Sequence, residues 1–395
     1  MRTISAHYIF DGKGNFLKNG IVKIDNDGNI LDVIDTKGKL EESEGIEFYN
    51  GIITPGFINT HCHLELSHLK GVIPQKQGLA HFIRNVISHR SSSDEKIHQA
   101  ISSALIEMQT NGIVAVGDIS NKEITFEYKK QTDLYFHTFL ECYGVEEPAD
   151  KMSLEIANGL YEKWKSRIPI SVTPHASYSC SPLLLGKIQI SQEKNQGIYS
   201  IHNQECASEN ELFLSQSGEL HDGLVKMGMN LELLEFMGLN SVQTISKYFP
   251  NDGNKILIHN TFTSETDIEF LFDECSPETF YWCLCPNSNL YIENCLPNID
   301  LFKALNLQCV IGTDSYSSNT SLSILDELKT ITENTSTTNL SDMLVWACLN
   351  GAKALKIDER YGSIEKGKRP GINLIYDLDL LELKLLPESK VKVLA

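Results

Sequence analysis

No stretch of this 395-residue sequence approaches the roughly 18 consecutive apolar residues that a membrane-spanning helix needs. The opening residues, MRTISAHYIFDGKG, lack the apolar run of a secretory signal peptide. Basic residues are fewer than acidic ones, and the resulting net charge of −18 argues against nucleic acid or an anionic membrane as a partner. We therefore expect a cytoplasmic protein that acts on a small molecule.

The ten cysteines are scattered along the chain, and none of them forms the C-x-x-C spacing typical of zinc or redox sites. The closest pair, Cys283 and Cys285, is separated by a single residue. We expect reduced, mostly buried thiols. The composition, 41% apolar and 22% charged, is that of an ordinary globular protein with a large core.

Two kinds of pattern divide the chain. Residues 1–53 contain turn signals such as Asn26-Asp27-Gly28 between short apolar stretches, which predicts hairpins. Residues 54–359 alternate apolar runs with amphipathic segments, and residues 360–395 return to the turn-rich pattern. We expect the two ends to combine into one small composite β-sandwich beside a larger domain formed by residues 54–359.

The larger domain contains eight apolar runs of the kind that parallel strands need, because such strands are buried on both faces. The runs cover residues 56–63, 112–120, 134–144, 168–178, 197–205, 255–261, 279–289 and 308–315. Helical patterns lie between most of them, such as the segment that follows Ser93 and closes at Gly112. The predicted fold is therefore α/β, with a (β/α)8 TIM-type barrel.

Polar residues capable of catalysis stand at the ends of these predicted strands. They are His61, His63, His175, His202, Glu205, His259, Asn287, Asn289 and Asp314. In a TIM barrel the carboxyl ends of all strands meet at one face, where the active site lies. Histidine nitrogen and carboxylate oxygen suit Zn²⁺ or Fe²⁺, so His61, His63, His202 and Asp314 are the expected ligands of one divalent metal ion.

Each of these residues also has an ordinary structural explanation. A single strand histidine is more often a core or surface residue than a ligand, and Asp314 precedes a serine-rich loop where it would cap a helix. The convergence of several such residues on one barrel face is what favours a metal site. Glu205 would then shuttle a proton and His259 would orient the attacking water.

The motifs PGFINTHCHLELS, SIHNQE, LIHNT, CPNSN and GTDS resemble the amidohydrolase superfamily. The most similar branch holds chlorotriazine hydrolases, guanine deaminase, cytosine deaminase and nucleoside deaminases. The resemblance spans nearly the whole chain and implies the same ligand set, with Glu205 as the proton shuttle and His259 beside the hydroxide. Asp314 matches the ligand that also accepts a proton from water. No lysine ends the fourth strand, which favours one metal over two.

The resemblance also suggests a substrate class. The run His-x-His-Leu-Glu with Glu65, together with His175 in TPHASY, resembles deaminases of adenine nucleosides, above all those of aminodeoxyfutalosine, with methylthioadenosine and S-adenosylhomocysteine as related substrates. Glu65, His175 and Asn289 are the expected substrate contacts. Arg84 is either a contact for a substrate carboxylate or a surface residue of a helix.

Two alternatives remain open from the sequence. The same site could act on another ring, such as guanine, cytosine, a pterin, a chlorotriazine or a cyclic amide. A protein of another class, a non-catalytic metal-binding scaffold, would keep the fold without the reaction, although a decayed site would be expected to lose at least one of these residues. A homodimer is expected by analogy with the family alone.

Overall fold

Each of the eight predicted runs contains one strand in the computed structural model, which describes residues 1–39 and 45–395. The strands are β6 (Phe57–Cys62), β7 (Ile113–Ser120), β8 (Tyr135–Cys142), β9 (Ile170–Pro174), β10 (Tyr199–Asn203), β11 (Lys255–His259), β12 (Phe280–Leu284) and β13 (Cys309–Ile311). Nearly every residue in them is buried, as the continuous apolar runs predict.

The eight strands form two four-stranded parallel sheets, in the orders β6-β7-β8-β9 and β10-β11-β12-β13. The two sheets also meet at both of their edges. On one side a parallel bridge joins Ala176 to His202, and on the other the backbone N–H of Thr313 donates to the carbonyl oxygen of His61 at 3.1 Å. The carboxyl ends of all eight strands therefore lie at one face of the molecule.

Helices follow most of the strands. They are α1 (Leu79–His89), α2 (Asp94–Thr110), α3 (Phe126–Gln131), α4 (Ala149–Trp164), α5 (Pro182–Asn195), α6 (Ala207–Ser215), α7 (Glu219–Lys226), α8 (Ser241–Ile245), α9 (Glu265–Glu274), α10 (Pro286–Ile292), α11 (Ile299–Ala304), α12 (Ile324–Asn334), α13 (Leu340–Val345) and α14 (Gly351–Ala354). Helix α2 shows why these segments are helical. The Ser93 side chain accepts from the N–H of Lys96 at its start, and Gly112 follows its end with φ of 73°.

The two ends of the chain share one sheet. Its strands are β1 (Arg2–Phe10), β2 (Phe16–Lys18), β3 (Ile21–Ile24), β4 (Ile30–Ile34), β5 (Ile46–Pro55), β14 (Ile372–Tyr376) and β15 (Lys390–Val393). The order is β15-β14-β5-β1-β3-β4, with β2 paired to β1. The described terminal strands thus join a single sheet, and a second stacked layer, as the predicted sandwich would need, is not among them.

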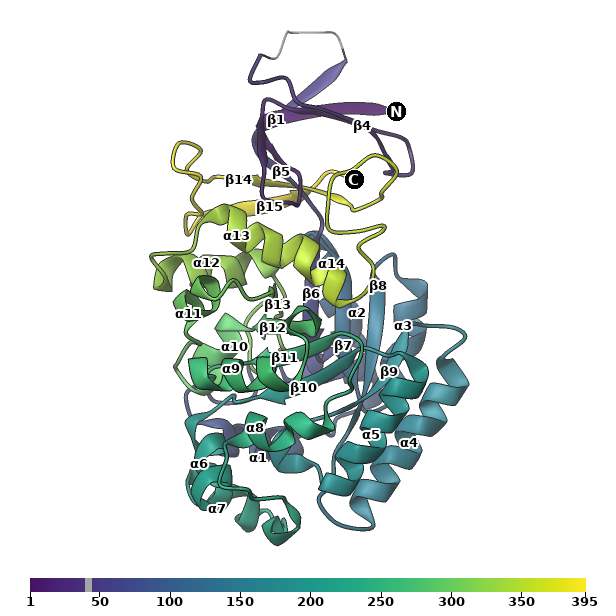
Figure 1. Ribbon diagram of the computed structural model, residues 1–395. Coiled ribbons are helices and arrows are strands. Elements are labelled where there is room, and N and C mark those ends of the chain that lie inside the picture. Colours follow the sequence, from purple (N-terminus) through teal and green to yellow (C-terminus); the bar gives the residue numbers. More distant parts are fainter. Residues whose placement is uncertain (40–44) are drawn as a thin grey trace.

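The terminal sheet lies at one end of the molecule, with both chain ends beside it, and α1, α6 and α7 lie at the opposite end (Figure 1). The sheet therefore sits away from the face where the strands of the larger domain end. Within residues 1–39 and 45–395, no helix combines the length and the apolarity needed to cross a bilayer.

A buried ion pair supports the segment that follows the first two histidines. Lys129 Nζ lies 2.6 Å from Asp118 Oδ2, and both side chains are 0% exposed. The other oxygen of Asp118 accepts from the backbone N–H of Leu64 at 2.7 Å. The pair thus links β7, α3 and the turn after His63.

We expect Lys129→Met to lower the free energy of unfolding by about 3–5 kcal/mol, because it leaves the Asp118 carboxylate buried without its cation. Urea titration followed by circular dichroism measures the change. Lys130→Met is the matched control, since Lys130 is exposed and its ion pair with Glu127 lies at the surface; the control should change stability by less than about 0.5 kcal/mol. A Lys129→Met protein as stable as the wild type would contradict the expectation.

Candidate active site

The four predicted metal ligands lie together where their strands end. His63 Nε2 lies 3.3 Å from His202 Nε2, and Asp314 Oδ1 lies 3.4 Å from both His61 Nε2 and His63 Nε2. The ring nitrogens of His61, His63 and His202 fall within 4.8 Å of one another. His61 lies at the end of β6 and His63 directly follows the strand, two positions further on, which brings the first two histidines into the same group.

The surroundings of these histidines fit a cation. Both ring nitrogens of His61 are buried without a hydrogen-bond partner, and such atoms call for a ligand. Burial, with His61 next, lowers the pKa of His63 to about 3; burial, with His175 next, lowers that of His202 well below its usual range. The rings of His63 and His202 are therefore neutral, which is the form that coordinates a metal.

The orientation of the His202 ring is set by a hydrogen bond on the side away from the metal group. His202 Nδ1 donates to the carbonyl oxygen of His175 at 2.9 Å, which leaves Nε2 as the lone-pair nitrogen that faces the group. Three imidazoles and one carboxylate are a donor set that suits Zn²⁺ or Fe²⁺. The residues present can therefore hold one divalent metal ion.

Asp314 is held in place from its far side. Ser288 Oγ and Ser318 Oγ both donate to Asp314 Oδ2, at 2.7 Å and 2.5 Å, so Oδ1 is the oxygen left for the histidines. Burial alone would raise the pKa of Asp314, but the neighbouring His61 and His63 outweigh it and hold this pKa well below its usual range. Its backbone has φ of 54°, a strained conformation of the kind found at functional sites.

We expect Ser318→Ala to weaken zinc binding by about 10- to 100-fold, because the second partners of a liganding carboxylate fix its geometry. Competition with a fluorescent chelator measures the dissociation constant. Ser321→Ala is the control, since Ser321 lies in the same loop as Ser318 but its Oγ donates to Asp326 of α12, outside the group. Equal zinc affinity in Ser318→Ala and the wild type would show that Asp314 needs no such support.

Glu205 and His259 lie beside this group as a pair. Glu205 Oε1 is 3.5 Å from His259 Nε2, and both residues line the same cavity as His63, His202 and Asp314. Burial, with Asp314 next, raises the pKa of Glu205 well above its usual range. Burial also lowers the pKa of His259 to about 3. A carboxyl that holds its proton and a neutral imidazole are thus placed side by side.

The cavity has a volume of about 520 Å³ and two unlike walls. One wall carries polar groups at the ends of β8 and β9, including Glu141, His175 and Ser179. The other wall comes from α1 and the end of α7, and its apolar side chains are Leu79, Phe82, Ile83, Val86, Ile87, Leu224, Met227 and Met229. Such a cavity can hold a flat polar ring with an apolar extension.

The structure brings His175 to this cavity but places Glu65 elsewhere. His175 lines the cavity, and its Nδ1 lies 2.7 Å from Ser179 Oγ. Glu65 is not among the described lining residues. One of its oxygens pairs with Arg90 Nη2 at 3.3 Å, and the other accepts from the backbone N–H of Asn121 at 3.0 Å. Glu65 therefore supports the cavity wall from behind, and we no longer expect it to contact substrate.

Asn289 and Arg84 also lie outside the lining. Asn289 belongs to α10, where Nδ2 donates to Thr261 Oγ1 at 2.5 Å, and its amide faces the buried ring of His259. It supports His259 rather than meeting a substrate. Arg84 is exposed on α1, with Nη2 2.8 Å from His81 Nδ1, which is the surface alternative of the two that the sequence left open.

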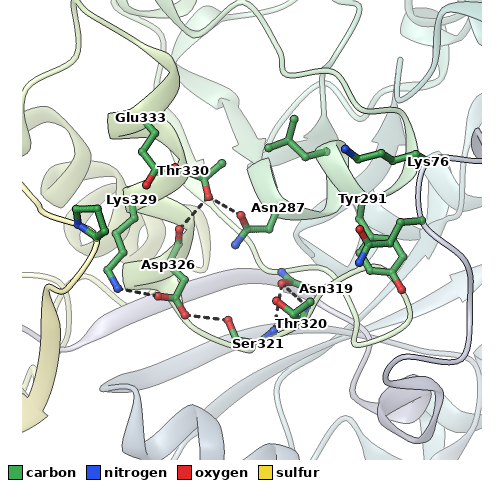
Figure 2. A pocket seen from close by; sticks show the side chains of 13 residues that line it. Lys76, Asn287, Tyr291, Asn319, Thr320, Ser321, Asp326, Lys329, Thr330 and Glu333 are labelled. Carbon is green, nitrogen blue, oxygen red and sulfur yellow. Dashed lines mark hydrogen bonds and ion pairs between the residues drawn. The ribbon is translucent and has the colours of Figure 1, made fainter.

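Asn287, at the end of the seventh run, faces a different hollow. Figure 2 shows this hollow, where Thr330 Oγ1 donates to Asn287 Oδ1 at 2.5 Å and Lys329 pairs with Asp326. The reason is that β12 ends at Leu284 and α10 begins at Pro286. The helix turns Asn287 away from the metal group.

The lining includes polar residues that were not predicted from the sequence, among them Arg90, Asn121 and Glu141. Glu141 stands at the end of the third predicted strand, so its position was visible as an acidic residue at a strand end. Arg90 follows α1, and Asn121 follows β7; nothing in their local sequence marks them. Their role depends on the Glu65 contacts described above.

Solved structures share this fold. The crystal structure of Helicobacter pylori aminofutalosine deaminase in complex with methylthio-coformycin aligns with a TM-score of 0.80 and 22% identity, over 95% of this chain and 92% of that one. A zinc-bound adenosine deaminase from Xanthomonas campestris aligns with a TM-score of 0.74 and 20% identity, over 98% and 87%. These likenesses show that the chain shares the mixed α/β fold of these two structures.

Sequence comparison extends the relationship. An adenosine deaminase of Helicobacter pylori is 27% identical over 341 residues, which cover 83% of this chain and 79% of that protein. A 5-methylthioadenosine/S-adenosylhomocysteine deaminase of Thermoanaerobacter pseudethanolicus is 28% identical over 347 residues, 83% and 74% of the two chains. The model of the amidohydrolase family matches residues 52–391, a range that contains every residue of the site. The chain therefore belongs to the amidohydrolase family.

Proposed function

We propose that this protein is a metal-dependent hydrolase that deaminates an adenine nucleoside derivative, with aminodeoxyfutalosine, methylthioadenosine and S-adenosylhomocysteine as the leading candidates. The observation that carries the proposal is the pairing of Glu205 with His259 beside the group of His61, His63 and Asp314, in one cavity. The relatives that share the family are deaminases of adenosine and of methylthioadenosine or S-adenosylhomocysteine.

We propose Zn²⁺ as the resident ion, held by His61, His63, His202 and Asp314, with Fe²⁺ as the alternative. Support comes from the neutral imidazoles of His63 and His202. The two buried His61 nitrogens without hydrogen-bond partners add to it. When bound, the ion would act as a Lewis acid toward a water molecule and so supply a nucleophile at neutral pH.

The side chains divide the proton transfers among them. Asp314 Oδ1 takes the proton of the attacking water, since its other oxygen is held by two serines. The protonated Glu205 donates to the ring nitrogen next to the reacting carbon, which makes that carbon electrophilic. His259 stabilises the developing negative oxygen with a hydrogen bond. Glu205, now a carboxylate, takes the hydroxyl proton of the tetrahedral addition product and passes it to the amino group. The carbonyl forms as the C–N bond breaks and ammonia leaves, and the proton held by Asp314 passes to Glu205, which restores both groups.

We also propose the finer architecture that the sequence predicts. The two parallel sheets would close into a (β/α)8 barrel over residues 54–359, supported by the Ala176–His202 bridge and the Thr313 to His61 hydrogen bond. Residues 1–53 and 360–395 would form the composite β domain. The homodimer stays a prediction.

Ammonia release from the zinc-loaded protein tests the activity. The panel holds aminodeoxyfutalosine, methylthioadenosine, S-adenosylhomocysteine, adenosine, guanine and cytosine. Turnover of one or more of the adenine nucleosides, lost on removal of zinc, supports the proposal. Turnover of guanine or cytosine alone would support deamination as the reaction but show that the substrate is a nucleobase rather than an adenine nucleoside. If the zinc-bound protein released no ammonia from any compound in the panel, the assignment to adenine nucleosides would be wrong.

A further inference from the structure

Glu141 lines the cavity and carries a buried carboxyl oxygen without a hydrogen-bond partner. The residue lies at the carboxyl end of β8 and is 8% exposed. Its Oε2 accepts from Asn121 Nδ2 at 3.2 Å, while Oε1 is buried without a hydrogen-bond partner. Leaving a buried carboxyl oxygen unpaired is costly, and Glu141 lines the cavity. An unpaired oxygen of this kind can accept a hydrogen bond from a donor on a molecule bound in the cavity.

The position of Glu141 is fixed by its neighbours. Glu65 behind the wall holds the backbone of Asn121 and the guanidinium of Arg90. The Asn121 amide in turn holds Glu141, through both its side chain and its carbonyl oxygen. Such a supported chain of contacts is how a recognition group is kept in one orientation.

The metal group does not need this carboxyl. His202 Nδ1 lies 3.8 Å from Glu141 Oε1, which is beyond hydrogen-bond length. The same Nδ1 donates its single proton to the carbonyl oxygen of His175. A cation placed between Glu141, His175 and His202 would have to displace that bond. Glu141 is thus neither the orienting partner of His202 nor part of a ready second metal site.

The substrate class narrows which donor can reach Glu141. Apart from its 5′ substituent, an adenine nucleoside has donors only at its 6-amino group and at its ribose hydroxyls, because its unprotonated ring nitrogens accept. The 6-amino group must lie at Glu205 and the metal group, where the reaction occurs. Glu205 follows β10 and Glu141 ends β8, with His175 of the intervening segment between them. The sugar hydroxyls are the donors left for Glu141.

The apolar part of the lining suits the rest of such a molecule. The faces of α1 and α7 that line the cavity are apolar, and they offer nothing to a diol. They can instead pack against an apolar 5′ substituent.

We propose that Glu141 accepts hydrogen bonds from the ribose 2′,3′-diol of the substrate and selects ribonucleosides over deoxyribonucleosides. The proposal rests on the proposed function, since it takes the reacting ring from there. Removing either hydroxyl would take away one of the two hydrogen bonds to the Glu141 carboxyl, so kcat/KM of the wild type should fall by about 10- to 100-fold for either deoxynucleoside.

The test compares adenosine, 2′-deoxyadenosine and 3′-deoxyadenosine in the zinc-loaded wild type and in Glu141→Ala. A nucleoside that is not turned over is measured as an inhibitor of the accepted panel substrate, and its inhibition constant replaces kcat/KM. We expect the wild type to prefer adenosine by the factor above, and Glu141→Ala to lose most of that preference. Glu146→Gln is the control, because Glu146 is an exposed carboxylate on the same cavity; its preference should match that of the wild type.

The outcomes separate the two proposals. If the wild type binds and deaminates the three nucleosides equally, the proposed role of Glu141 is wrong, while the proposed deaminase function stands. A preference that persists in Glu141→Ala would also overturn it. Loss of bound zinc in Glu141→Ala would assign the residue to the metal site instead. A wild type that neither binds nor turns over any adenine nucleoside would overturn the proposed function, and this inference with it.

Discussion

Glu205→Gln is expected to lower kcat by about 10²- to 10⁴-fold, with zinc content and stability unchanged. The amide keeps the size of the carboxyl but can neither deliver a proton to the ring nitrogen nor carry it to the leaving amine. The raised pKa of Glu205, caused first by burial and then by Asp314, is what makes it a proton donor near neutral pH. Ammonia release under saturating substrate measures the effect.

The control for this variant is Glu211→Gln. Glu211 lies on the exposed side of α6, the helix that begins just after Glu205, and there the same change removes a charge away from the cavity. It should retain the wild-type kcat. A Glu205→Gln enzyme with kcat near that of the wild type, and with zinc bound, would remove Glu205 from the proton transfers.

Asp314→Asn is expected to lose bound zinc and with it at least about 10³-fold in activity. The variant replaces the single negative ligand of the group, and the amide would turn its neutral oxygen or its N–H₂ toward His61 and His63. Elemental analysis after dialysis gives the metal content, and the activity assay with added zinc shows whether excess metal rescues the variant.

Chelation of the wild type provides the comparison for this variant. Removal of the metal should abolish ammonia release, and added Zn²⁺ should restore it, whereas Asp314→Asn should respond only weakly to the same addition. Full occupancy and full activity in the variant would mean that the histidines hold the ion without the carboxylate. That result would contradict the ligand role of Asp314, which we infer from its distances of 3.4 Å to His61 and His63.

The strands and the metal group were predictable from sequence because their signals are local. Continuous apolar runs indicate strands buried on both faces, and parallel strands bring their carboxyl ends to one edge. His61, His63, His202 and Asp314 therefore had to meet once the strands were placed. Only the order of the residues along each run was needed for this part of the prediction.

The substrate wall was less predictable because it depends on where each strand stops. Asn289 was expected at the end of a strand, but β12 ends at Leu284 and a helix turns the residue toward Thr261. Glu65 is two residues beyond His63, yet the short helix there aims it at the backbone of Asn121. For Glu141 the sequence shows the position at the end of a strand. It does not show that one carboxyl oxygen lacks a hydrogen-bond partner.

The shared terminal sheet has a consequence for synthesis of the chain. Strand β5 pairs with β1 on one side and with β14 on the other. On the ribosome, β1 and β5 emerge early, but β14 emerges only after the whole larger domain has been translated. Until then β5 presents an open edge, the feature that promotes pairing with other chains. Translation that stops before Ile372 should therefore yield a product that aggregates, even though every residue of the metal site has already been made.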